Sequence, residues 1–280
     1  MIGVIDVIDV IDVIGVDGLD RRRGGCYDVG MQRRPRLTTS DLRDLLAERV
    51  VVFDGAMGTQ LQARKLEAAD FGGEDYAGCN EHLALTRPDV VAAIHRDYYE
   101  AGADFVETDT FGGTPLVLAE YGLADKAIAI NEAAARIARD VAEEMERGDG
   151  RARFVAGSMG PTTRTISVTG GITFDEMAAH YEQQALGLLQ GGADVLLVET
   201  SIDTLNTKAA LVGIERAEAK LAVDVPLMLS CTIEAMGTML AGQTAEAFHV
   251  SLEHAARRPS AATGGGLVSV GLNCATGPDP

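Results

Sequence analysis

The 280-residue sequence has no tryptophan and only four cysteines, which are Cys26, Cys79, Cys231 and Cys274. Cysteines so few and so widely scattered do not make the dense disulfide scaffold of a small secreted domain, and they favour a reducing, cytoplasmic location. The sequence also lacks an apolar run of the ~18 residues that a membrane-spanning helix needs. These absences argue against a disulfide-stabilised module and against a membrane protein.

Positive charge is scarce as well. The chain has 24 Lys and Arg residues against 42 Asp and Glu residues, which gives a formal net charge of −18. A protein with this charge is repelled by nucleic acids and by anionic membranes, so we expect neither as a partner. Hydrophobic residues make up 46% of the chain, and at this length they can form a large core in one domain or two.

Residues 1–36 differ in pattern from everything that follows. An Ile-Asp-Val tripeptide occurs three times over residues 5–13, and a period of three matches neither a strand nor a helix. The basic residues come after this apolar part, which is the reverse of a signal peptide. We expect a disordered or non-native extension in which Cys26 is inert; a targeting segment or a metal-binding tail is the alternative.

From residue 37 onward, short apolar runs alternate with helical patterns. We interpret the apolar runs that start near residues 50, 104, 154, 195, 226 and 267 as strands. A short helix over 41–48, with Thr39 or Ser40 as its cap, precedes them. Further helices are predicted over 88–101, 124–147, 174–190, 203–222 and 244–257. Continuous apolar strands separated by helices are typical of a parallel sheet that is buried on both faces.

Two α/β architectures have this pattern. A doubly wound sheet usually has a glycine-rich phosphate turn after its first strand, and residues 55–58 (Gly-Ala-Met-Gly) are not one. A (β/α)8 TIM-type barrel keeps its functional residues at the carboxyl ends of its strands. Polar residues recur at those positions here, namely Asp54, Glu107, Asp109, Ser158, Glu199, Thr232, Asn273 and Cys274. We therefore expect residues 37–280 to be a barrel domain with about six of its eight strands, truncated before the last two βα units.

Asp54 and Glu199 are carboxylates at the ends of the first and fourth predicted strands. In a barrel they face one mouth, where such a pair can bind an ammonium group, hold a metal ion or act as acid and base. Each alone can instead be a loop cap or an ion-pair partner. Glu107 and Asp109 flank Thr108, and strand alternation places both on one face; one of the two can be structural.

Cys274 follows the predicted strand at 267–270. A buried cysteine is more often a small core residue than a ligand. Cys231, at the end of the neighbouring strand, is a conceivable second thiolate, although core packing is the better interpretation. The five histidines have no ligand spacing. His95, His180 and His254 fall within predicted helices, where we expect surface or packing roles.

Six segments in order carry a family resemblance. They are DGAMGT (54–59), ETDTF (107–111), GPTTRT (160–165), ETSIDTLN (199–206), GQT (242–244) and GLNC (271–274). With them, residues 49–280 resemble the homocysteine S-methyltransferase family, and most closely its homocysteine-binding domains in cobalamin-dependent methionine synthases. The resemblance implies a zinc-dependent methyltransferase that methylates the thiol of homocysteine to form methionine.

The resemblance also implies roles for particular residues. Cys274 would be a zinc ligand, and the two other cysteine ligands of the family lie in a Gly-Gly-Cys-Cys-Gly motif that this sequence does not contain. Asp54 and Glu199 would hold the amino group of homocysteine, and Asn273 would help shape the site. No catalytic residue is implied beyond the zinc site.

Two more residues, Gly55 and Thr110, would complete the substrate site by the same resemblance. Asp109 departs from the family pattern, because relatives often have Asn at this position. The substitution adds a negative charge near the mouth and changes the hydrogen bonds available there.

The methyl donor implied by the resemblance is methylcobalamin, carried on another module, with folate- and cobalamin-binding modules normally in the same polypeptide. Residues 171–175 and 203–206 favour this group over relatives that use S-methylmethionine or betaine. Two alternatives stay open, a non-catalytic fragment of such a barrel and a zinc-independent barrel enzyme with an acid–base pair. With one thiolate of three, we expect the chain alone to bind zinc weakly and to be inactive.

Overall fold

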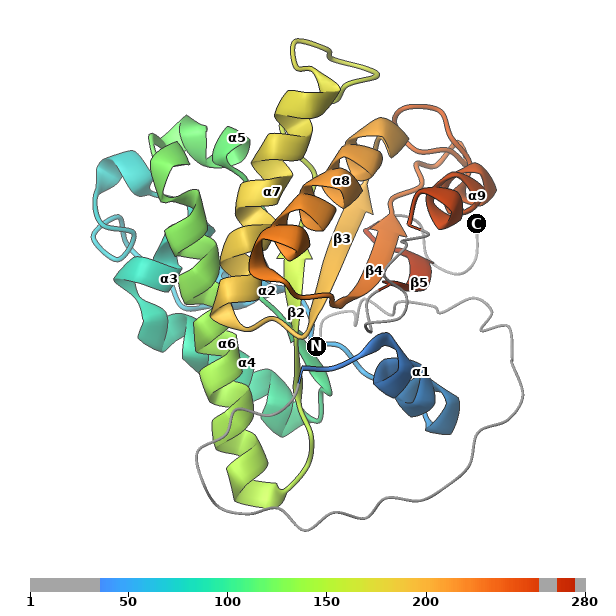
Figure 1. The fold of residues 1–280 in the computed structure, drawn as a ribbon. Coiled ribbons are helices and arrows are strands. Elements are labelled where there is room, and N and C mark those ends of the chain that lie inside the picture. The colour runs from blue at the N-terminus through green and yellow to red at the C-terminus, as the bar shows by residue number, and fades with distance from the viewer. Residues whose placement is uncertain (1–35, 257–265, 275–280) are drawn as a thin grey trace.

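The computed structural model of the chain describes residues 36–256 and 266–274 (Figure 1). Within them, five strands form one parallel sheet in the order β1-β2-β3-β4-β5, so strands that are adjacent in the sheet follow one another in the sequence. They are β1 (Phe105–Glu107), β2 (Phe154–Met159), β3 (Val195–Ser201), β4 (Pro226–Cys231) and β5 (Gly266–Leu272). The parallel α/β sheet predicted from the apolar runs is confirmed.

Helices occupy the segments between the strands, close to where the sequence predicts them. The longer ones are α1 (Thr39–Glu48), α4 (Pro88–Ala101), α6 (Ala127–Asp149), α7 (Phe174–Gly191), α8 (Thr204–Leu221) and α9 (Ala245–Ala255). Short helices α2 (Met57–Ala63), α3 (Leu83–Thr86) and α5 (Pro115–Leu118) lie in the connections. The cap of α1 is Thr38, not Thr39 or Ser40, because Thr38 and Asp41 exchange hydrogen bonds in a capping box.

Both faces of the sheet are buried, as the continuous apolar strands predict. On one face, Phe105, Phe154 and Leu197 pack with Leu42 of α1. On the other face, the alternate strand residues pack against α4, α6, α7, α8 and α9. Helices α6, α7 and α8 lie side by side along this second face (Figure 1). The strand ends are therefore held in place from both sides.

Glycines bring these helices unusually close together. A Cβ on Gly187 of α7 would lie 2.5 Å from the carbonyl oxygen of Ile128 in α6. A Cβ on Gly213 of α8 would likewise lie 2.6 Å from the carbonyl oxygen of Ala178 in α7. Real Cβ atoms do not approach oxygen this closely, so any larger residue at either position forces the two helices apart.

The strand predicted at residues 50–53 is only partly realised. Phe53 forms an isolated parallel bridge with Phe105, and the N–H groups of Asp104 and Phe105 both donate to the carbonyl of Val52. The segment is extended, but its pairing to β1 is too short to be a strand, and Val50 and Val52 are exposed. A sequence pattern of four apolar residues cannot distinguish this bridge from a fully paired strand.

The extension predicted at residues 1–36 lies outside the described residues except for Arg36, whose guanidinium donates to the carbonyl of Leu189 at 2.9 Å. Among the helices described, none is long and apolar enough to cross a bilayer.

Candidate functional site

The polar side chains of the candidate site continue rows of core residues. On the face of the sheet that α1 covers, the side chains change from apolar to polar at the carboxyl ends of the strands. Side chains two residues apart in a strand lie on the same face. Glu107 is therefore on the same face as Phe105, and Ser158 is on the same face as Ala156. Glu199 likewise follows Leu197 on this face. The strand register thus gathers polar groups at one end of a hydrophobic interior.

Three carboxyl groups meet at this end of the sheet: Asp54, Glu107 and Glu199. Both oxygens of Asp54 accept from the backbone N–H of Glu107, at 3.0 and 3.1 Å. The hydroxyl of Ser158 donates to Oε1 of Glu199 at 2.5 Å. Asp54 and Glu199, which the sequence places at one mouth, are therefore brought together, with Glu107 joining them.

Burial and mutual repulsion disfavour negative charge in this cluster. The pKa of Asp54 is raised well above its usual value, first by burial and then by the charge of Glu199. The pKa of Glu107 is raised well above its usual value by burial, by the charges of Glu199 and Asp54, and by a hydrogen bond with Glu199. Burial also raises the pKa of Glu199, whereas hydrogen bonds from Ser158, Glu107 and Thr200 oppose that shift. Burial and mutual repulsion therefore favour the neutral forms of these groups.

No basic side chain neutralises these carboxyl groups in the described part of the chain. Arginines and lysines there pair with other acids, such as Arg49 with Asp104 and Arg139 with Asp194. Asp54, Glu107 and Glu199 have no such partner. Glu199 is buried, and Asp54 and Glu107 are half-buried. Carboxylates that are removed from water without a cation are costly, so this cluster is suited to a ligand that brings positive charge.

Asn273 connects the carboxyl cluster to Cys274. Its Oδ1 accepts from the N–H of Thr200 at 3.0 Å and from the hydroxyl of Ser230 at 2.9 Å. Its Nδ2 donates to Oγ1 of Thr200 at 2.8 Å and lies 3.4 Å from Oε2 of Glu199 and 3.5 Å from Sγ of Cys274. The amide therefore fixes the spacing between the carboxylate and the thiol.

Backbone strain marks the same place. Thr200 and Cys274 have φ values of 53° and 55°, in the left-handed region that residues with a side chain rarely adopt. The β3–β4 register also shifts between Val198 and Ser201, and an irregularity of this kind redirects side chains at a strand end. Strain of this kind is often found where function dictates the geometry.

Two further residues predicted for substrate binding lie close by in different settings. A Cβ on Gly55 would lie 3.2 Å from the hydroxyl oxygen of Tyr98, so the backbone passes close to that ring. Thr110 is completely buried, and its hydroxyl donates to the carbonyl of Ser158 at 2.7 Å and contacts Oγ1 of Thr108 at 2.6 Å. Thr110 supports the strand end beneath the site.

The sequence grouped Glu107 with Asp109 on one face, and that grouping is wrong. Strand β1 ends at Glu107, so the alternation stops there and the chain turns. Glu107 joins the cluster, whereas Asp109 is buried beside Glu81. The alternation of side chains along a strand, which places Glu107 in the site, is visible in the sequence. The residue at which strand β1 ends is not.

The fit of the described residues to a zinc ion is limited to one ligand. Cys274 is exposed at the mouth, where a metal ion can reach its thiol. Cys231 is fully buried in the core, and burial raises its pKa to about 12, which confirms the packing interpretation. Over residues 36–256 and 266–274, no three Cys, His, Asp or Glu side chains converge on a point that could hold a metal. A three-ligand catalytic zinc site is not formed by these residues alone.

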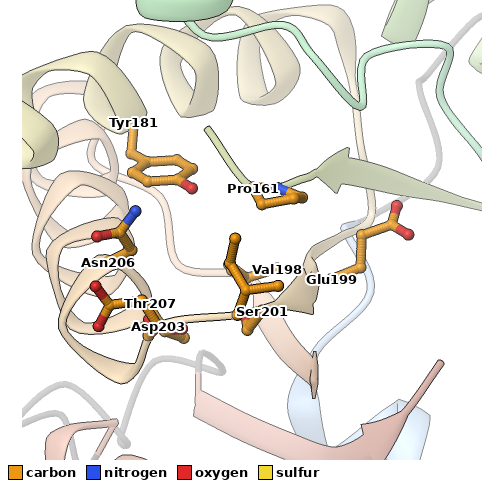
Figure 2. A pocket seen from close by; sticks show the side chains of 9 residues that line it. Pro161, Tyr181, Val198, Glu199, Ser201, Asp203, Asn206 and Thr207 are labelled. Carbon is orange, nitrogen blue, oxygen red and sulfur yellow. Dashed lines mark hydrogen bonds between the residues drawn. The ribbon is translucent and has the colours of Figure 1, made fainter. Parts of the chain in front are cut away.

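A small pocket lies on the opposite side of β3. Tyr181, Asn206 and Thr207 line it, and Glu199 points away from them (Figure 2). The hydroxyl of Tyr181 donates to the carbonyl of Gly160 at 3.1 Å, and the amide of Asn206 donates to the carbonyl of Arg164 at 2.9 Å. These polar groups are occupied in holding loops, so the pocket supports the strand end.

Comparison with known proteins gives concordant matches. A family model described as homocysteine S-methyltransferase matches residues 51–280. Methionine synthase of Mycobacterium tuberculosis (strain ATCC 25618 / H37Rv) is 45% identical over 242 residues, which are 86% of this chain and 19% of that protein. The chain thus spans about a fifth of that relative's length.

Two solved structures share the fold. The metallated form of the homocysteine methyltransferase MmuM from Escherichia coli has a TM-score of 0.66 at 25% identity, covering 83% of this chain and 77% of its own. The apo form of the same protein has a TM-score of 0.61 at 23% identity, covering 83% and 75%.

Proposed function

Since this chain belongs to the homocysteine S-methyltransferase family, we propose that its site binds homocysteine and presents the thiol for methylation to methionine. The observation that carries the proposal is the cluster of Asp54, Glu107 and Glu199, which has no cationic partner in the described part of the chain and lies next to Cys274. An amino acid with a thiol at its other end can contact both features at once.

The carboxyl cluster would recognise the ammonium group of homocysteine. An ammonium group has three N–H donors, and Glu199 and Asp54 offer acceptors that no side-chain cation occupies. A hydrogen bond to a charged group contributes about 1.5–3 kcal/mol. The role of these carboxylates is positioning, because holding the amine fixes where the sulfur lies.

Zinc dependence is part of the proposal, with Cys274 as one thiolate ligand and the family's two other cysteine ligands in a motif that this sequence does not contain. A metal-bound thiol is deprotonated, and the thiolate is the nucleophilic form. Asn273 would set the orientation of Cys274 through its amide contact. The metal would thus lie beside the carboxylates that hold the other end of the substrate.

We propose methylcobalamin on a separate module as the donor, with folate- and cobalamin-binding modules as partners. Similarity to a methionine synthase supports this choice over S-methylmethionine or betaine. Exposed apolar side chains lie in the loops that follow the strands (Phe111, Val168, Met236 and Leu240) and in the first turn of α8 (Leu205), and they give a large donor an apolar surface to contact.

We further propose that the five-strand sheet is part of a (β/α)8 barrel. The all-parallel order and the likeness to the fold of MmuM support a barrel. Residues 37–280 would be its homocysteine-binding domain, and its location would be the cytoplasm.

The test of homocysteine recognition compares two ligands that differ by the ammonium group. Isothermal titration of the 280-residue chain with L-homocysteine and with 4-mercaptobutyrate should give about 10–100-fold weaker binding for the second, the equivalent of one charged hydrogen bond. Glu199→Gln should abolish most of this difference, whereas Glu120→Gln, at an exposed position, should leave it unchanged. Equal binding of both ligands by the wild-type chain would disprove recognition of the amine.

The test of chemistry extends the chain with a C-terminal segment that carries the family's Gly-Gly-Cys-Cys-Gly motif, loads it with zinc and measures formation of methionine from homocysteine, with methylcobalamin, S-methylmethionine and betaine supplied in separate assays. We expect turnover with methylcobalamin only, and no turnover with any donor would refute the proposed chemistry. Turnover that persists after removal of zinc would support the zinc-independent acid–base alternative instead.

A further inference from the structure

Asp109, in the loop after β1, is a buried acid that the proposed chemistry does not use. Its side chain is 6% exposed, and in the described part of the chain its Oδ2 is buried without a hydrogen-bond partner. A carboxylate in this state would be a buried charge with nothing to compensate it, which is among the costliest arrangements in a protein interior. The geometry therefore disfavours the ionised form.

The groups that face Asp109 make its ionisation harder still. They are the carboxylate of Glu81 and the thiol of Cys79, whose Sγ lies 3.8 Å from Oε2 of Glu81. Tyr121 faces the same pair of side chains. In the described part of the chain, neither an arginine nor a lysine offsets the rise in the pKa of Asp109 or Cys79. Burial, followed by the charge of Glu81, raises the pKa of Asp109 to about 8.

Glu81 is the member of this group that holds the loop through a hydrogen bond. Its Oε1 accepts from the backbone N–H of Gly112 at 2.7 Å. A Cβ on Gly112 would lie 2.7 Å from the same oxygen, so the loop is packed directly on this carboxylate. Oε1 of Glu81 is thus committed to Gly112, whereas Oδ2 of Asp109 has no hydrogen-bond partner in the described part of the chain, so Asp109 is the group better suited to carry a proton.

The loop that carries Asp109 is joined to the carboxyl cluster by hydrogen bonds. The hydroxyl of Thr110 donates to the carbonyl of Ser158, and the N–H of Ser158 donates to Oγ1 of Thr108 at 3.0 Å. The hydroxyl of Ser158 in turn donates to Glu199. The amide of Gln184 donates to the carbonyl of Thr110 at 2.7 Å. A shift of the loop at Asp109 is transmitted through two residues to Glu199.

We propose that Asp109 is a positioning residue that works as a neutral carboxylic acid. While it carries its proton, residues 108–113 keep Thr110 against Ser158 and so fix the carboxylate of Glu199. Loss of the proton places a second negative charge beside Glu81 and displaces the loop. Asn is the neutral residue of the same shape, so Asp109→Asn should preserve the loop and remove its dependence on pH.

The sign of the effect on stability follows from linkage. The unfolded chain releases the proton of Asp109 near pH 4, whereas the folded chain keeps it until about pH 8. The contribution of Asp109 to stability is therefore most favourable below pH 4 and is lost as pH rises toward 8. Between these values the unfolding constant attributable to this residue rises about tenfold per pH unit.

The experiment compares urea unfolding of the wild-type full chain, Asp109→Asn and the exposed control Asp125→Asn at pH 5, 6, 7 and 8. We expect the unfolding constant of wild type to rise about tenfold per pH unit relative to Asp109→Asn, and Asp125→Asn to follow wild type. Parallel pH profiles for wild type and Asp109→Asn would overturn the proposal. A carboxyl 13C signal of Asp109 that titrates near pH 4 in the folded protein would overturn it equally.

The consequence for ligand binding rests on the proposed function and is measured separately. Homocysteine affinity of wild type should fall by up to about tenfold from pH 7 to pH 9, following the fraction of neutral Asp109, whereas that of Asp109→Asn should change much less. If neither protein binds homocysteine at any pH, the proposed function fails while the unfolding profiles still test Asp109. If both bind with the same pH profile, the transmission from Asp109 to Glu199 is disproved.

Discussion

His95 of α4 gives a prediction whose size follows from its burial. The side chain is completely buried, and in the described part of the chain neither ring nitrogen has a hydrogen-bond partner. Burial lowers the pKa of His95 from 6.5 to about 4, because charging the ring inside the core removes its solvation. Folding therefore requires the neutral ring.

The sign and magnitude come from comparing the two states. The unfolded chain binds a proton at His95 below pH 6.5, and the folded chain does so only near pH 4. The stability contribution is complete above pH 6.5 and is lost as pH falls through that window. Going from pH 7 to pH 5 should cost the wild-type chain about 2 kcal/mol at this one residue, at ~1.4 kcal/mol per unit of pKa difference.

We predict that His95→Leu removes this loss. Urea unfolding at pH 7 and pH 5 should show a stability decrease that is about 2 kcal/mol smaller in His95→Leu than in wild type. At pH 7 the variant should be no less stable than wild type, because two buried nitrogens without partners disappear at the cost of a small change in shape. His249→Gln, at an exposed position, is the control. Equal decreases in wild type and His95→Leu would refute the reasoning.

Three further outcomes are expected. Zinc titration of the 280-residue chain should give weak binding that Cys274→Ser abolishes, because the described residues provide one ligand; a tight one-to-one complex would contradict this. Ser158→Ala should weaken homocysteine binding by about 10-fold through loss of the hydrogen bond to Glu199, with little change in thermal stability; unchanged affinity would show that Glu199 is held by other contacts. Gly187→Ala should destabilise the fold by about 1–3 kcal/mol in urea unfolding, because its Cβ would overlap Ile128, and a neutral effect would mean that α6 and α7 separate easily.

The sequence was informative where a pattern repeats. Helix α4 begins at Pro88 and ends at Ala101, as predicted, because proline at its start and Gly102 at its end are local signals. The strands at 154, 195 and 226 were recognisable because they are apolar on both faces. Asp54 and Glu199 could be placed together because parallel strands end at one edge of a sheet.

The sequence was uninformative where a residue's environment is set by distant segments. Asp109 looked like a mouth residue, yet it is buried against Glu81, which lies 28 positions earlier in the chain. The hydrogen bonds of Asn273 with Thr200 and Ser230 depend on a local irregularity in β3. No residue pattern in the sequence predicts this irregularity. The sequence does not single out Thr38 as the helix cap, because three consecutive hydroxyl residues (38–40) give the same capping signal.

The glycine contacts between α6, α7 and α8 have a mechanical consequence. Backbones that touch without intervening side chains cannot slide or tilt by small amounts, because there are no rotamers to absorb the movement. These three helices and the strands they cover should therefore behave as one stiff block. Any opening of the site must then come from the loops at the carboxyl ends of the strands, while the helix-covered sheet moves as a unit.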